Sequence, residues 1–204
     1  WLEALPKEMI LRRPVLGSLK GFALIFCGRP PQEATVLFQE MAEAGSLDQF
    51  QGEATTVQAL LAILQGKSTD ARQLSEQALQ QLPAERSFFR SLAADSLGMA
   101  YTLAGDIEAG SRAFEQVVEI AMRSENYIMA LLALTNLAGL RYVQGHMRTA
   151  ITTCQQVVEL ANQQIGKQTP VIGKTLLNLG EMLREQGNLE AAQKYLLEAA
   201  GMME

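Results

Sequence analysis

Few side chains in this 204-residue sequence combine the types and the spacing that catalysis requires. His146 is the only histidine, and a cysteine nucleophile would need it close in space. Cys154 follows about two helical turns later, where we expect its thiol to face a core. Two cysteines and one histidine at these spacings match no zinc-binding pattern either. We predict no catalytic residue, no metal site, no bound cofactor and no enzymatic activity.

Two further groups of residues suggest chemistry at first sight but have simpler explanations. Gly66-Lys67-Ser68 resembles the end of a phosphate-binding loop, yet that motif needs a preceding strand and a glycine where Leu61 stands. Glu181 and Glu185 lie on one helical face, as a paired acid and base could, but Arg184 beside them indicates a solvated ion network. We therefore interpret both groups as surface features.

The charge balance argues against several classes of partner. The formal net charge is -5, whereas binding to phosphates requires clustered Lys and Arg. Residues 160–179 superficially suggest a helix-turn-helix, yet their only cations are Lys167 and Lys174. Apolar runs such as 128–134 are far shorter than the roughly 20 residues of a membrane helix, and the N-terminus lacks the features of a signal peptide. We expect a cytoplasmic protein that contacts neither nucleic acid nor membrane through this segment.

The elements that carry these residues repeat along the chain. Gly-centred turns recur at Gly28, Gly66, Gly105, Gly145 and Gly187, with gaps of 38, 39, 40 and 42 residues. Periods of about 20 to 50 residues are typical of stacked repeats, and each glycine separates two apolar helical segments, as a helix C-cap does. The sequence is also rich in the helix formers Ala, Leu, Gln and Glu. We therefore predict an all-α, right-handed α-solenoid of about five helix hairpins.

The predicted helices form pairs, and each pair is joined at one of the marker glycines. In the second helices of repeats three to five, apolar residues recur at spacings of three and four, which places them on one face. Because a lone hairpin cannot bury both of its faces, we expect the hairpins to stack into a single domain over residues 1–204. The ten predicted helices are 14–27 with 32–44, 52–65 with 69–81, 87–104 with 107–123, 127–144 with 147–164, and 171–186 with 189–203. The predicted stripes are Ala113, Phe114, Val117, Val118 and Ala121; Ala150, Cys154, Val157, Val158 and Ala161; and Ala192, Leu196 and Ala199.

The repeat pattern resembles a tetratricopeptide (TPR) array, which has a Leu-Gly pair and an aromatic residue in the first helix, followed by a turn glycine and further small and aromatic residues. Repeat three matches through Leu97, Gly98, Tyr101, Gly105 and Phe114. All intervals exceed the usual 34 residues of this family, so longer helices or loops are expected.

The N-terminal run resembles a narrower family, the MalT-like, LuxR-type transcriptional activators. The likeness lies in Trp1-Leu2-Glu3-Ala4-Leu5-Pro6, Arg13-Pro14 and Gly28-Arg29. Such proteins join a nucleotide-binding module, a superhelical sensor arm and a C-terminal helix-turn-helix. The resemblance implies that this sequence, which does not begin with Met, is the arm of a longer protein.

Repeats four and five also resemble the long TPR units of kinesin-light-chain-like adaptors, through Thr135-Asn136-Leu137-Ala138 and Leu177-Asn178-Leu179-Gly180. In those adaptors the Asn bonds the backbone of an extended peptide, since an amide offers one acceptor and two donors. The same amides could equally bond water or neighbouring helices in an empty groove. The groove that the resemblance implies comprises Ser96, Asn136, Tyr142, Asn178, Glu181 and Arg184.

These observations lead to one hypothesis and one alternative. We expect a ligand-sensing and protein-interaction arm of a transcriptional regulator, which binds an effector molecule or a regulatory protein or peptide on its concave face. Self-association of the arm belongs to the same hypothesis. The alternative is a standalone TPR adaptor that binds peptides.

Overall fold

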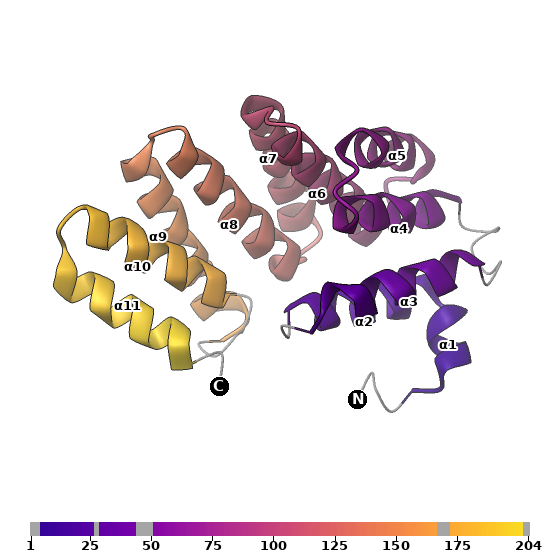
Figure 1. Ribbon diagram of the computed structural model, residues 1–204, viewed down its shortest axis with the longest axis horizontal. Coiled ribbons are helices and arrows are strands. Elements are labelled where there is room, and N and C mark those ends of the chain that lie inside the picture. Colours follow the sequence, from indigo (N-terminus) through magenta and orange to yellow (C-terminus); the bar gives the residue numbers. More distant parts are fainter. Residues whose placement is uncertain (1–4, 27–28, 44–50, 167–171, 202–204) are drawn as a thin grey trace. The chain divides into compact units, whose positions relative to one another are not determined.

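A computed structural model describes residues 5–26, 29–43, 51–166 and 172–201. Within these ranges the chain forms eleven helices and no strand, so the predicted all-α class is confirmed (Figure 1). The chain divides into two compact units, Trp1–Asp106 with helices α1–α6 and Ile107–Glu204 with helices α7–α11. The boundary lies within the third predicted hairpin. A single domain over residues 1–204 stays a prediction.

The ten predicted helices are present, and each begins and ends within two residues of its predicted limits where the structure describes them. One short helix, α1, was missed. Its five residues bury only Ile10, so they are too few to show a helical period. The helices are α1 Lys7–Leu11, α2 Pro14–Phe26, α3 Pro31–Glu43, α4 Gln51–Leu64, α5 Ser68–Gln81, α6 Ser87–Leu103, α7 Ile107–Arg123, α8 Tyr127–Val143, α9 Met147–Gln164, α10 Gly173–Glu185 and α11 Leu189–Gly201.

Four of the marker glycines end their helices in the left-handed conformation. Gly66, Gly105, Gly145 and Gly187 have φ values of 72°, 81°, 80° and 80°, a region that costs glycine little. In each turn the glycine N–H bonds a carbonyl three residues earlier, and the next N–H bonds one five residues earlier. This is the hydrogen-bond pair of a Schellman motif, and it confirms these four predicted turns. The fifth marker, Gly28, lies outside the described residues.

The core of the second unit lies between consecutive hairpins. One cluster joins Ile151 and Cys154 of α9 to Leu179 and Leu183 of α10, and a second joins Val157 of α9 to other residues of α10. Neighbouring hairpins therefore bury each other's apolar faces, as the stacking argument requires. Most of the predicted stripe is buried, whereas Val118, Val158 and Leu196 are half-buried.

The first unit packs in the same manner. Helices α2 and α3 form one hairpin, and α4 contacts α5 and α6. A buried cluster unites Ala62 and Ile63 of α4 with Ala71 of α5 and Ala100 of α6. Small residues at these positions let the helix axes approach closely.

Candidate functional site: the first-helix surface of α8 and α10

Five of the six predicted groove residues lie on two adjacent helices, α8 and α10. Two side-chain hydrogen bonds join the helices at the surface: Lys174 Nζ donates to Asn136 Oδ1 at 3.3 Å, and the Tyr142 hydroxyl donates to Glu185 Oε1 at 2.5 Å. On α10 the accessible residues Lys174, Asn178, Glu181 and Glu185 follow one another at spacings of four, three and four, which places them on one helical face. We call this region, with Asn136, Gly139 and Tyr142 of α8, the first-helix surface.

A buried hydroxyl pair fixes α8 against α10 beneath this surface. Thr135 Oγ1 and Thr175 Oγ1 are 2.6 Å apart, and both side chains are buried. The Thr135 hydroxyl also donates to the Leu131 carbonyl at 2.8 Å. Because that bond uses its single hydrogen, Thr175 must be the donor of the pair. Such satisfied buried polar contacts hold the register of the two helices.

The two asparagines retain hydrogen-bonding capacity for a ligand. Both are half-buried, and the Asn136 amide group uses one acceptor position for Lys174. The Asn178 side chain has no hydrogen bond within the described ranges. An amide can donate twice and accept twice, so both side chains can bond a peptide-like group.

The charged residues of the surface pair with each other. Arg184 Nη2 and Nε lie 2.7 Å and 2.9 Å from Glu181 Oε2, as the ion-network interpretation expected. This hydrogen bond raises the pKa of Arg184, so its charge is permanent. The bond to Glu185 raises the pKa of the Tyr142 hydroxyl, which is therefore a neutral donor at ordinary pH. The surface thus offers a permanently charged guanidinium, a neutral phenol and two amides.

Ser96 differs from the other predicted groove residues. It lies in α6 of the first unit, its side chain is fully buried, and its hydroxyl donates to the Leu92 carbonyl of its own helix at 2.9 Å. A hydroxyl in that position is not presented to a ligand, so we leave Ser96 out of the proposed surface. Lys174, Glu185 and Gly139 were not among the predicted groove residues. The four-three-four spacing that links Lys174 and Glu185 to Asn178 was the signal that could have found them.

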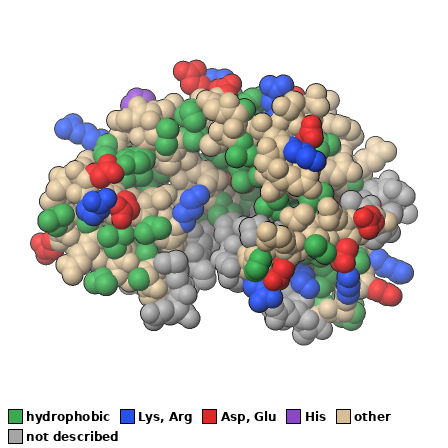
Figure 2. Space-filling model, in the orientation of Figure 1, with side chains coloured by type: hydrophobic (Ala, Val, Ile, Leu, Met, Phe, Trp, Pro, Cys, Tyr) green, Lys and Arg blue, Asp and Glu red, His purple; other side chains and the backbone are tan. Residues whose placement is uncertain are grey.

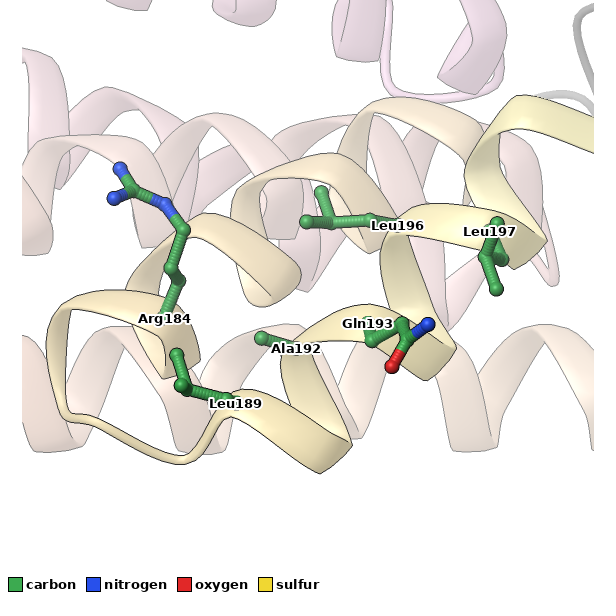
Figure 3. A pocket seen from close by; sticks show the side chains of 6 residues that line it. All are labelled: Arg184, Leu189, Ala192, Gln193, Leu196 and Leu197. Atoms are coloured by element: carbon green, nitrogen blue, oxygen red, sulfur yellow. The ribbon is translucent and has the colours of Figure 1, made fainter.

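A shallow hollow lies on the last hairpin, between Arg184 of α10 and the residues of α11 (Figure 3). It measures about 320 Å³. Leucines dominate its lining, and Leu189 and Leu197 are each 65% exposed. An apolar side chain fits this hollow better than a polar ligand does. The lining residues are Arg184, Leu189, Ala192, Gln193, Leu196 and Leu197.

Acidic and basic side chains are interspersed on both units among the residues coloured in Figure 2. Within the described part of the chain, no three His, Cys, Asp or Glu residues gather in a way that could hold a metal ion. The described helices include none that combines the length and the apolar character needed to cross a membrane.

Solved structures with a similar fold are TPR-like repeat proteins. BtubC (BKLC) from P. vanneervenii superposes with a TM-score of 0.65 at 17% identity, over 92% of this chain and 77% of that chain. A putative kinesin light chain with nearly identical TPR-like repeats, from Podosopora anserina, gives a TM-score of 0.61 at 18% identity, over 98% of this chain and 96% of that chain. At these identities the likeness shows the fold, an α-solenoid built of TPR-like hairpins.

The chain is also similar in sequence to curated transcription regulators. The HTH-type transcriptional regulator MalT of Serratia proteamaculans is 27% identical over 94% of this chain, and its counterpart in Yersinia pestis is 26% identical over 95%. The chain spans about a fifth of the length of these relatives, 22% in both cases. The family model of the MalT-like TPR region matches residues 52–204. The chain therefore belongs to the MalT-like TPR region family.

Proposed function

We propose that this chain is the ligand-sensing arm of a cytoplasmic transcription regulator. Its first-helix surface binds an effector molecule or a regulatory protein, and binding is transmitted to nucleotide-binding and DNA-binding modules outside this sequence. The observation that carries the proposal is the pair of half-buried asparagines, Asn136 and Asn178, inside the segment that matches the MalT-like family. The relatives are named as HTH-type regulators, which supports the modular arrangement.

Transmission requires that the partner prefer one arrangement of the modules. A ligand shifts an equilibrium only by its difference in affinity for the two states. A repeat arm suits this role because each hairpin contacts only its neighbours, so a ligand across two hairpins favours one angle between them. Helices α8 and α10 belong to consecutive hairpins, and the Lys174 and Tyr142 bonds already connect them.

Two experiments test the proposal. The reading frame around this segment should encode a nucleotide-binding module before it and a helix-turn-helix after it; a frame that starts near Trp1 and stops near Glu204 would overturn the regulator hypothesis. In the full-length protein, Asn136→Ala with Asn178→Ala should abolish the transcriptional response to the effector and leave the melting temperature nearly unchanged. Gln155→Ala with Gln156→Ala, which removes two exposed amides from α9, is the matched control and should leave the response intact.

The standalone adaptor is the weaker candidate. It depends on the likeness to kinesin light chain repeats, which at 18% identity concerns the fold. The curated relatives above are transcription regulators.

A further inference from the structure

The last hairpin, α10 and α11, presents an apolar face that the described residues leave open. Leu189 and Leu197 of α11 are each 65% exposed, and with Leu196 they line the hollow of about 320 Å³ (Figure 3). Single exposed leucines are common on protein surfaces, whereas several apolar side chains around one hollow mark a surface that contacts another element.

The equivalent face of the preceding hairpin, α8 and α9, is covered by α10. Thr135 of α8 lies ten residues before its turn glycine and is 3% exposed, and the Thr175 hydroxyl of α10 lies 2.6 Å from its own hydroxyl. Leu177 of α10 has the same place in the last hairpin and is 43% exposed. Ile151 of α9 lies six residues after its turn glycine and is buried in a cluster with residues of α10, whereas Gln193 at the same place in α11 is exposed. The open face therefore extends over both helices of the last hairpin, at the places that a following first helix covers.

We propose that a sixth hairpin of the same repeat packs on this face, and that its first helix lies against α10 and α11 as α10 lies against α8 and α9. The occupant is a segment of the same polypeptide, encoded after Glu204. The relatives support this choice, because this chain spans 22% of their length. Stacked repeats bury each apolar face against the next repeat, so the contact continues the one already present between α9 and α10. The inference does not rest on the proposed effector or on its binding surface.

The hollow indicates two of the residues that the sixth hairpin presents. Leu179 and Leu183 of α10 lie eight and four residues before their turn glycine, and they pack in the buried cluster that contains Cys154 of α9. Leu196 of α11 has the place of Cys154 in the last hairpin. Apolar residues eight and four places before the sixth turn glycine should therefore fill the hollow beside Leu196.

Leu177 indicates a third residue of the sixth hairpin. Thr175 lies twelve residues before its turn glycine, and its hydroxyl bonds the Thr135 hydroxyl. The residue twelve places before the sixth turn glycine would meet Leu177 instead. We expect this residue to be apolar, because a hydroxyl buried against leucine would lose its bonds to water without gaining another.

Leu197 differs in chemistry from its counterparts in α5 and α7. Glu76 and Glu115 also lie ten residues after a turn glycine. The Tyr101 hydroxyl donates to Glu76 Oε1 at 3.3 Å, and each partner lies four residues before the next turn glycine. The second partner is Arg141, whose Nη2 lies 3.9 Å from Glu115 Oε1. A leucine in place of the glutamate favours an apolar partner, which is the same residue that the hollow requires four places before the sixth turn glycine.

The first test is the sequence encoded after Glu204. The intervals between the five turn glycines are 38 to 42 residues, so a sixth glycine should follow Gly187 after about 40 residues. The residues twelve, eight and four places before it should be apolar and should lie in a helical pattern. A reading frame that stops before the length of one hairpin, or polar residues at these three places, would overturn the inference.

The second test measures whether the face is covered. In a Cys27→Ser background, Gln193→Cys places a thiol in the hollow. Gln156→Cys is the matched control, because Gln156 of α9 is exposed although α10 follows it. In the full-length protein a maleimide should modify the thiol at 193 at least about tenfold more slowly than the thiol at 156, as measured by mass spectrometry of the peptides. In the 204-residue chain, whose helical circular dichroism spectrum is checked first, the two rates should be similar.

A third protein identifies what covers the face. A chain extended to the end of the sixth hairpin should protect the thiol at 193 as well as the full-length protein does. Protection that needs the full-length protein would mean that another module covers α11, and equal rates in the full-length protein would mean that nothing does; both results would overturn the inference. Protection in the 204-residue chain that rises with protein concentration would assign the face to a second copy, with the same consequence. The transcriptional response of Asn136→Ala with Asn178→Ala tests the proposed function separately, because neither residue belongs to this face.

Discussion

The second helices of the last two hairpins, α9 and α11, have equivalent positions in very different surroundings. Counted from the turn glycines, Ile151 in α9 corresponds to Gln193 in α11, and Cys154 corresponds to Leu196. Ile151 and Cys154 are buried in a cluster with residues of α10. Gln193 is exposed and Leu196 half-buried, and both line the hollow on α11.

This difference teaches that the outer part of the stripe on a second helix becomes core where a following hairpin packs on it, whereas Ala192 and Ala199 of α11 are buried against the preceding helices. Local sequence sets which face of the helix is apolar, but the neighbour decides whether that face loses its contact with water. Leu189 shows the same point, since it is 65% exposed whereas its counterpart in α9, Met147, is half-buried and packs against the buried cluster. The comparison can be tested by making equal changes at equivalent positions.

Introducing a charge should have the largest effect. Ile151→Lys places an unpaired ammonium among the buried residues of α9 and α10, and it should lower the free energy of unfolding by about 3 kcal/mol or more. Gln193→Lys places the same group at the equivalent open position and should change stability by less than about 0.5 kcal/mol. Urea denaturation of the two variants measures both values. Equal losses would show that the α11 face is covered in solution.

Thiol reactivity provides the second test. Burial raises the pKa of Cys154 to about 11, so at pH 8 only on the order of 0.1% of it is thiolate, against about a quarter for an ordinary cysteine. A cysteine introduced by Leu196→Cys borders the hollow instead of the core. In a Cys27→Ser background, iodoacetamide should label Cys154 at least about a hundredfold more slowly than the residue introduced at 196. Similar rates would mean that the α9 position opens readily or that the α11 position is covered.

The third test compares glycines in the first helices of the same two hairpins. Gly180→Ala pushes a Cβ against Leu196 and the Ala192 carbonyl, and it should lower the free energy of unfolding by about 1 kcal/mol, since Leu196 can turn toward the hollow. Gly139→Ala meets open space and should raise stability by roughly 0.5 to 1 kcal/mol. Thermal and urea unfolding of the two variants should therefore shift in opposite directions. A loss of stability in both would remove the distinction between the packed and the open glycine.

The helices and their turns could be predicted from sequence because their causes are local. A left-handed C-cap such as Gly105 or Gly187 is marked by the residue itself, and the three-four spacing of apolar residues follows from the helix. The exception is the turn after α7, where Glu125 has a φ of 54°. The N–H of Asn126 still bonds the Ala121 carbonyl there, so the same cap forms without the glycine that would have revealed it.

The contacts of the candidate site could be predicted less well because they depend on the relative orientation of neighbouring helices. Asn136 and Asn178 are equivalent in sequence, yet the bond partner of Asn136 is Lys174, at a separation of 38 residues, whereas Tyr142 bonds Glu185 at a separation of 43. A fixed period cannot give both pairs. Ser96 occupies the position equivalent to Asn136 but is buried, since burial is decided by other elements and not by the register of its own repeat.

The smallest effect is expected at the threonine pair, which connects α8 of the fourth hairpin to α10 of the last hairpin. Thr135→Val removes the acceptor of the buried Thr175 hydroxyl and should lower the free energy of unfolding by about 1 kcal/mol. The reason is that a buried donor without an acceptor is not compensated for the loss of its hydrogen bonds to water. Thr135→Val with Thr175→Val removes both polar groups at nearly constant shape, and it should cost less than Thr135→Val alone. The interaction energy of the double-mutant cycle should be about 0.5 to 1 kcal/mol. Additive losses would mean that the hydroxyls act independently. The buried contact between α8 and α10 would then be apolar, and the polar contacts between the two helices would be the surface bonds of Lys174 with Asn136 and of Tyr142 with Glu185.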